Sequence, residues 1–113
     1  MALVVRQDLR MSGGKVAAQC SHAALGAALK AKNLVPEMYK RWMKIGPTKI
    51  ALRVKSEKEL LEIEEVAKSH KLITYKVKDA GLTQIAPGSI TVLAIGPAPL
   101  AKIDEVTKKY SLL

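Results

Sequence analysis

The stretch "ITVLAIGP", residues 90–97, decides how this chain folds. It contains no charged side chain, and β-branched or aliphatic residues fill most of its positions. Such a run is typical of a strand that is buried on both faces, as a central strand of a sheet is. The sequence therefore predicts a sheet with residues 90–97 at its centre.

Three other runs have the pattern of strands, at residues 2–6, 49–55 and 72–77. In "KIALRVK", residues 49–55, apolar residues alternate with basic ones, as in a strand with one buried face. The loop "KDAGLTQIAPGS" joins the third run to residues 90–97 and carries no helix pattern. A link of this kind permits its two strands to be antiparallel neighbours.

Four helices are expected, at about residues 15–32, 36–44, 56–70 and 99–110. Ser12 or a following glycine can cap the first helix, and Ser56 with Glu59 forms a capping box for the third. Small apolar residues recur at helical spacing in the first helix and mark its face toward the core: Val16, Cys20, Ala23, Ala24 and Ala27.

Strands and helices alternate along most of the chain, which implies right-handed crossovers and strands that run parallel. The predicted fold class is α/β: a three-layer α/β/α sandwich around a small mixed, largely parallel four-stranded sheet. The length of 113 residues suits a single domain, residues 1–113.

Cysteine content and hydropathy limit the compartment and the kind of site. The single cysteine, Cys20, cannot form an intramolecular disulfide and excludes a cysteine-built zinc site. The strand at residues 2–6 leaves no room for a signal peptide, and no run is long enough to cross a bilayer. We expect a soluble, cytoplasmic protein.

The positive charge lies in one half of the chain. Residues 1–55 hold 11 basic and 2 acidic side chains, whereas residues 56–113 hold 8 of each, so the first half carries the whole net charge of +9. Basic surfaces bind polyanions because neutralised phosphates release counterions. Nucleic acid is the leading partner and an anionic membrane the second; an ordinary lysine-rich surface is the alternative to both.

Three polar residues form a ridge on the first helix. At 100° per residue, Lys15, Gln19 and His22 fall within about 60° of one another. A lysine in the first turn meets the positive end of the helix dipole, which is unfavourable unless a carboxylate compensates. Such arrangements are common in active sites, although simple solvation of a surface helix would also explain each residue.

Other chemistries fit this helix poorly. Cys20 and His22 diverge by about 200°, and Ser21 and His22 by about 100°, so neither a cysteine nucleophile nor a hydrolase triad is favoured. "SGGKV" lacks the glycine spacing and the hydroxyl residue of a phosphate-binding loop. Two histidines, His22 and His70, are too few to indicate a metal site.

A second polar cluster surrounds the loop between the last two strands. Asp79, Gly81 and Thr83 lie in this loop, and Thr91 begins the strand that follows. Strand ends in α/β sheets build ligand crevices. Asp79 could instead only shape a turn.

"GGKVAAQCSHA", followed at this distance by "KDAGLTQIAPGSITVLAIGPAP", closely resembles the second, archaeal and eukaryotic type of peptidyl-tRNA hydrolase. The resemblance starts at "LVVRQDLRM" and spans essentially the whole chain. It implies hydrolysis of the ester between peptide and tRNA, which recycles tRNA from aborted translation, by a homodimer that requires neither metal nor cofactor. The family's implicated residues map by motif onto Lys15, Gln19, Asp79, Thr83 and Thr91, with His22 in the same helix motif.

The residues suit this reaction, because hydrolysis of an activated ester needs a positioned water and a group that stabilises the oxyanion. Our hypothesis is that Asp79 activates the water and that Lys15 stabilises the oxyanion or a nearby phosphate. The candidates for binding the tRNA backbone are Arg6, Arg10, Lys40, Arg41, Lys44 and Lys49. A non-catalytic RNA-binding module and an esterase for small acyl substrates are the alternatives.

Overall fold

A computed structural model describes residues 1–81 and 85–113. The described residues form four strands and four helices in the order expected from the sequence. These are β1 (Ala2–Arg6), α1 (Gly13–Leu34), α2 (Pro36–Lys44), β2 (Ile50–Val54), α3 (Glu57–Ser69), β3 (Thr74–Lys78), β4 (Ile90–Ile95) and α4 (Leu100–Thr107).

The strands form one mixed sheet in the order β2-β1-β4-β3. β4 is buried at all six of its residues, Ile90–Ile95, and takes the interior position that its apolar sequence predicts. The expectation of a largely parallel sheet is wrong. β1 and β2 are parallel, but β4 is antiparallel to both β1 and β3. β4 enters between two strands that share one direction, and this makes two of the three pairings antiparallel.

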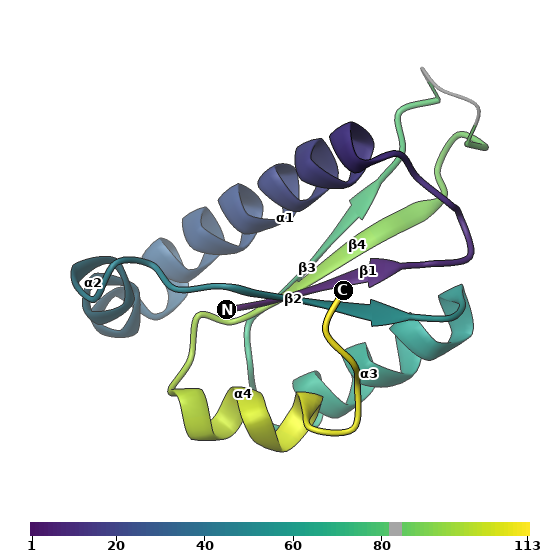
Figure 1. Ribbon diagram of the computed structural model, residues 1–113. Coiled ribbons are helices and arrows are strands. Elements are labelled where there is room, and N and C mark those ends of the chain that lie inside the picture. Colours follow the sequence, from purple (N-terminus) through teal and green to yellow (C-terminus); the bar gives the residue numbers. More distant parts are fainter. Residues whose placement is uncertain (82–84) are drawn as a thin grey trace.

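Helices cover both faces of the sheet (Figure 1): α1 and α2 lie on one side, and α3 and α4 on the other. Each face has its own apolar core. Val5, Ala27 and Trp42 belong to the core beneath α1 and α2. Leu60 and Ile103 belong to the core on the opposite face. The two cores agree with the three-layer arrangement predicted from the sequence.

The chain ends of β3 and β4 that flank their connecting loop lie beside the start of α1 (Figure 1). Ser12 fixes that start, because its side chain accepts a hydrogen bond from the backbone N–H of Lys15 at 3.2 Å. The first helix therefore begins beside the strand ends that carry the second polar cluster. Within the described residues, no helix has the length and apolar character needed to cross a membrane.

Candidate active site

An ion pair joins the start of α1 to the end of β3. Nζ of Lys15 lies 2.5 Å from Oδ2 of Asp79. The Asp79 side chain is completely buried, whereas the lysine side chain keeps 21% of its surface exposed. α1 has no acidic residue in its own first turn, so Asp79 supplies the negative charge that the helix N-terminus favours. The fold thus provides the compensating carboxylate that Lys15 requires.

The second carboxylate oxygen of Asp79 is held by the loop. Oδ1 accepts a hydrogen bond from the backbone N–H of Gly81 at 2.7 Å, and the Asp79 backbone pairs with Ser89 and Gly88. Gly81 has a φ of +81°, which favours glycine, and a Cβ there would collide with the ring of Pro87. Asp79 therefore shapes a turn with one oxygen and binds Lys15 with the other.

Gln19 and Thr91 form a buried link one turn deeper along α1. Nε2 of Gln19 donates to Oγ1 of Thr91 at 2.8 Å, and this hydroxyl donates to the carbonyl of Val77 at 3.3 Å. Gln19 is 6% exposed and Thr91 is completely buried. Because both groups are satisfied, this chain of hydrogen bonds fixes α1 against β3 and β4 beside the ion pair.

The remaining two predicted site residues are His22 and Thr83. His22 is exposed on α1, where it lines a groove between this helix and β3. It lies on the same helix face as Gln19, one turn further along, and at the rim of the site. Thr83 lies outside the described residues.

The two nucleophiles that the sequence disfavoured, Cys20 and Ser21, stay disfavoured in the structure. Cys20 packs against the core under α1, and its burial raises the pKa of its thiol, which opposes formation of a nucleophilic thiolate. Oγ of Ser21 donates to the carbonyl of Ala17 at 2.8 Å, inside its own helix. In the described part of the chain, no group of three His, Cys, Asp or Glu side chains could hold a metal ion.

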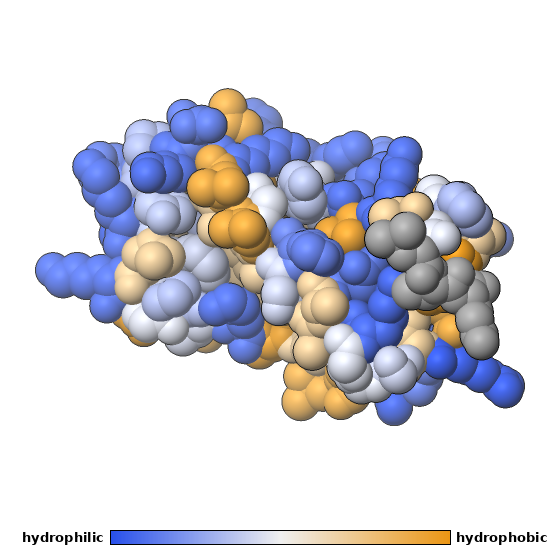
Figure 2. Space-filling model, turned by 90° about the horizontal axis from the view of Figure 1, so that it is seen from above, coloured by the Kyte–Doolittle hydropathy of each residue, from blue (hydrophilic) through white to orange (hydrophobic). Residues whose placement is uncertain are grey.

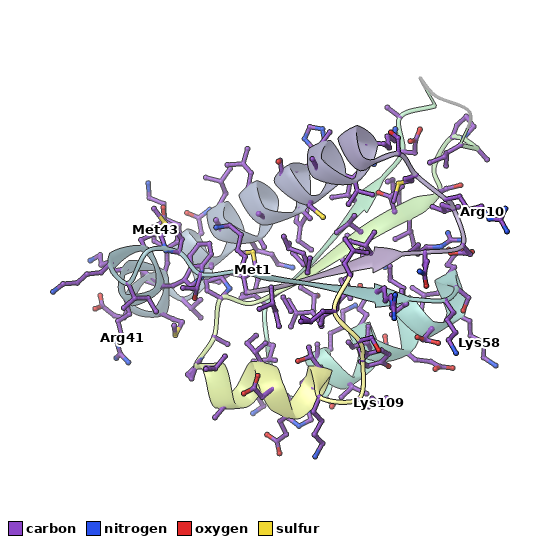
Figure 3. The ribbon with its side chains drawn as sticks, in the orientation of Figure 1. Met1, Arg10, Arg41, Met43, Lys58 and Lys109 are labelled. Carbon is purple, nitrogen blue, oxygen red and sulfur yellow. The ribbon has the colours of Figure 1, made fainter. Side chains whose placement is uncertain are left out.

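The basic candidates fall at two ends of the molecule. Arg10 lies beyond the end of β1, whereas Arg41 projects from α2 at the opposite end (Figure 3). Lys40 and Lys44 share α2 with Arg41, and all three are exposed. Lys49 follows α2, and its Nζ lies 5.3 Å from the centre of the Trp42 ring.

Arg6 is less available than the other basic candidates. Its guanidinium pairs with Asp8 at 2.7 Å and donates to the carbonyl of Ile90 at 3.1 Å. The hydrogen bond from Arg6 lowers the pKa of the Asp8 carboxyl, and Asp8 in turn raises the pKa of Arg6. The side chain of Arg6 thus ties the end of β1 to the start of β4.

The family model described as peptidyl-tRNA hydrolase PTH2 matches residues 1–113, the whole chain. The chain belongs to this family. The family resemblance seen in the sequence is confirmed.

Curated members of the peptidyl-tRNA hydrolase family are similar along nearly the whole chain. "Probable peptidyl-tRNA hydrolase 2" of Drosophila melanogaster is 50% identical over 113 residues, which are 100% of this chain and 61% of that protein. "Peptidyl-tRNA hydrolase" of Thermococcus onnurineus is 42% identical over 98% of this chain and 94% of its own length. The human "Peptidyl-tRNA hydrolase 2, mitochondrial" is 50% identical over 99% of this chain and 63% of its own length.

The geometry also shows which contacts the sequence did not reveal in this member of the family. The amide of Gly81 and the carbonyl of Val77 hold Asp79 and Thr91 in place. The Asp-x-Gly spacing at residues 79–81 was the signal for the first contact, since aspartate commonly accepts from the N–H two residues later. No sequence signal pointed to the Val77 carbonyl, because every residue has one.

Proposed function

We propose that this chain hydrolyses the ester between the peptide and the terminal ribose of tRNA, with Lys15 and Asp79 at the reacting centre. The observation that carries this proposal is the ion pair itself: a completely buried carboxylate 2.5 Å from a lysine in the first turn of α1. A fixed acceptor beside a fixed cation is what attack by water on an ester requires.

In the proposed reaction, Asp79 accepts a proton from a water molecule as its oxygen attacks the ester carbonyl carbon. Lys15 and the N-terminal amides of α1 stabilise the negative charge that develops on the carbonyl oxygen. The bond to the ribose oxygen then breaks, and the proton passes from Asp79 to that oxygen. The products are tRNA and a peptide with a free carboxyl group, which then loses its proton to solvent water.

The other predicted site residues position the substrate in this proposal. Gln19 and Thr91 hold α1 in place against the ends of β3 and β4. Thr83 binds the substrate or a water molecule. His22, at the exposed rim, contacts a part of the substrate that extends away from the reacting centre.

Binding of tRNA is proposed to use the exposed cations of α2 together with Arg10 and Lys49. Contacts to phosphates carry no sequence information, so tRNAs of different sequence should bind alike. Arg6 contributes indirectly, because its guanidinium already holds Asp8 and the Ile90 carbonyl.

The assembly and compartment are also proposals. We expect a homodimer, as the family resemblance implies, and light scattering on the purified protein would test this. We expect a cytoplasmic location, supported by the single unpaired Cys20. A relative is named mitochondrial, so cell fractionation is the appropriate test.

The decisive experiment measures release of N-acetylaminoacyl groups from tRNA by the native protein and by Lys15→Ala and Asp79→Asn. We expect kcat to fall by about 10²–10⁴-fold for Asp79→Asn and about 10²–10³-fold for Lys15→Ala, while tRNA binding persists. Glu64→Gln is the matched control, because Glu64 is another buried carboxylate paired with a lysine, Lys76, at 3.2 Å. Binding of tRNA by folded native protein without hydrolysis would instead indicate an RNA-binding module.

A further inference from the structure

A groove lies on the outside of the molecule between α1 and β3, next to the candidate active site. Its walls include His22, Leu25 and Leu29 of α1 and Tyr75, Val77 and Lys78 of β3. Lys78 directly precedes Asp79, and His22 lies one turn beyond Gln19. One end of the groove therefore lies close to Asp79 and to Gln19, two residues of the candidate active site.

The groove is lined by apolar side chains that solvent reaches. Leu25 is 60% and Leu29 is 54% exposed, although both belong to a helix whose opposite face is buried. Gly26 lies between them, and a Cβ at this position would collide with the ring of Tyr75. In Figure 2, which looks down on the α1 side of the molecule, apolar side chains stand among largely hydrophilic ones. The missing side chain at Gly26 lets the Tyr75 ring pack directly against α1 within the groove.

β3 is an edge strand whose outer side has no partner strand among the described residues. The Ile73 carbonyl accepts from Gly96 of the neighbouring chain segment, and bonded positions alternate along an antiparallel ladder. The backbone N–H and C=O of Lys76 therefore point away from β4. One outer carbonyl, that of Thr74, accepts from Nζ of Lys30 at 2.9 Å, and this limits the open edge to the end near the site.

The opposite edge of the sheet differs, because the C-terminal residues cover it. The N–H of Leu113 donates to the carbonyl of Ala51 at 2.9 Å, and the N–H of Arg53 donates to the carbonyl of Ser111 at 3.0 Å. Of the two outer strands, only β3 thus offers its backbone for pairing within the described structure, and it does so beside the active site.

We infer that the β3 edge and its groove bind the peptide part of peptidyl-tRNA as an added strand; this inference rests on the proposed function. Main-chain pairing to an open edge accepts any peptide sequence, as a substrate of varied sequence requires. With the ester at Lys15 and Asp79, the residues preceding it lie along Lys78 and then Lys76. Leu25, Leu29 and Tyr75 contact alternate side chains of the peptide. A second copy is disfavoured at this edge, because its lysines would meet the same lysines.

The test compares Lys76→Pro with Lys76→Ala. Both variants lose the same side chain and its ion pair with Glu64, but only proline also removes the outward N–H. Proline is tolerated at this position of an edge strand because the missing N–H does not serve the ladder to β4. For N-acetyl-tripeptidyl-tRNA we expect the KM of Lys76→Pro to exceed that of Lys76→Ala by about threefold to tenfold, the effect of one hydrogen bond. For N-acetylaminoacyl-tRNA, which does not reach Lys76, we expect equal KM values.

A second pair of variants tests the groove wall without touching the backbone. Leu25→Ser removes an exposed leucine of the groove, and Leu34→Ser removes a leucine on the same helix that is 63% exposed but lies outside the groove. Only Leu25→Ser should raise the KM for the tripeptidyl substrate, by about threefold or more. This pair decides the question if Lys76→Pro does not fold.

The outcomes separate this inference from the proposed function. No hydrolysis of either substrate by the native protein would refute both. The inference would be overturned if the two variants of each pair hydrolysed the tripeptidyl substrate with equal KM values. The proposed function would then remain intact. Weaker binding of deacylated tRNA by Lys76→Pro than by Lys76→Ala would assign the edge to nucleic acid instead, and a difference in their oligomeric state would assign it to a second copy.

Discussion

At the scale of single residues, the site depends on polar groups that are buried and satisfied. Oγ1 of Thr91 accepts from Gln19 and donates to the Val77 carbonyl in a region that solvent does not reach. A buried donor that loses its acceptor costs more than the hydrogen bond contributed, because its desolvation is no longer compensated.

Thr91→Val therefore leaves Nε2 of Gln19 buried without its acceptor. We expect the free energy of unfolding to fall by about 1–3 kcal/mol. Gln19→Leu combined with Thr91→Val should recover part of this loss, because both polar partners are then absent. Urea unfolding of the two variants measures the difference. A single variant as stable as the native protein would show that the link does not stabilise the fold.

The lone cysteine gives a pH-dependent prediction. Burial raises the pKa of the Cys20 thiol, so the folded protein holds this proton to a higher pH than the unfolded chain does. The free energy of unfolding should consequently decrease as pH rises above the ordinary thiol pKa of about 8.5. Iodoacetamide should alkylate Cys20 more slowly in the folded protein than in urea at about that pH. Equal rates would contradict the burial argument.

At the scale of elements, the first turn of α1 joins folding to chemistry. Ser12 caps this helix through the amide of Lys15, the residue whose side chain binds Asp79. Ser56 caps α3 in the same way, accepting from the amide of Glu59 at 3.1 Å. The described residues thus include two equivalent serine caps, and of these two only that at Ser12 adjoins the candidate site.

Ser12→Ala and Ser56→Ala should each lower the free energy of unfolding by about 1 kcal/mol. Only Ser12→Ala should also lower kcat for peptidyl-tRNA, because it loosens the turn that holds Lys15 and one of the amides at the helix start. Thermal unfolding and hydrolysis rates of the two variants provide the comparison. Equal loss of kcat in both would mean that activity follows global stability alone.

At the scale of the whole molecule, the candidate tRNA-binding cations lie toward two ends of an elongated body. The principal extents are 39, 26 and 20 Å, and Arg10 and Arg41 lie toward opposite ends of the view in Figure 3. A tRNA whose terminal ester sits beside α1 can follow this long surface toward α2. Such binding depends on released counterions and therefore on salt.

A charge-matched pair of triple variants tests this path. One replaces the three exposed cations of α2 by alanine, at Lys40, Arg41 and Lys44, and the control replaces three lysines at or after α4, at Lys102, Lys108 and Lys109. Both lower the net charge equally. We expect the slope of log affinity against log salt to shrink by about one for each phosphate that the α2 variant no longer neutralises. Equal slopes for the two variants would exclude a specific contribution of α2.

The sequence by itself determined the elements, both serine caps and the polar ridge on α1, because these depend on residues within a few positions of one another. It also determined the family, through motifs that read linearly. Four helices, four strands and a central strand at residues 90–95 were all predictable in this way.

Only the tertiary structure decided which strands pair and which polar groups meet. β4 enters between β1 and β3, and this long-range choice makes two of the three pairings antiparallel. The same choice brings Thr91 to Gln19 across 72 residues of sequence and places Asp79 against Lys15. Local periodicity fixes which face of an element is buried, but it holds no information about the partner across that face. That partner is settled by how the whole set of apolar faces packs together.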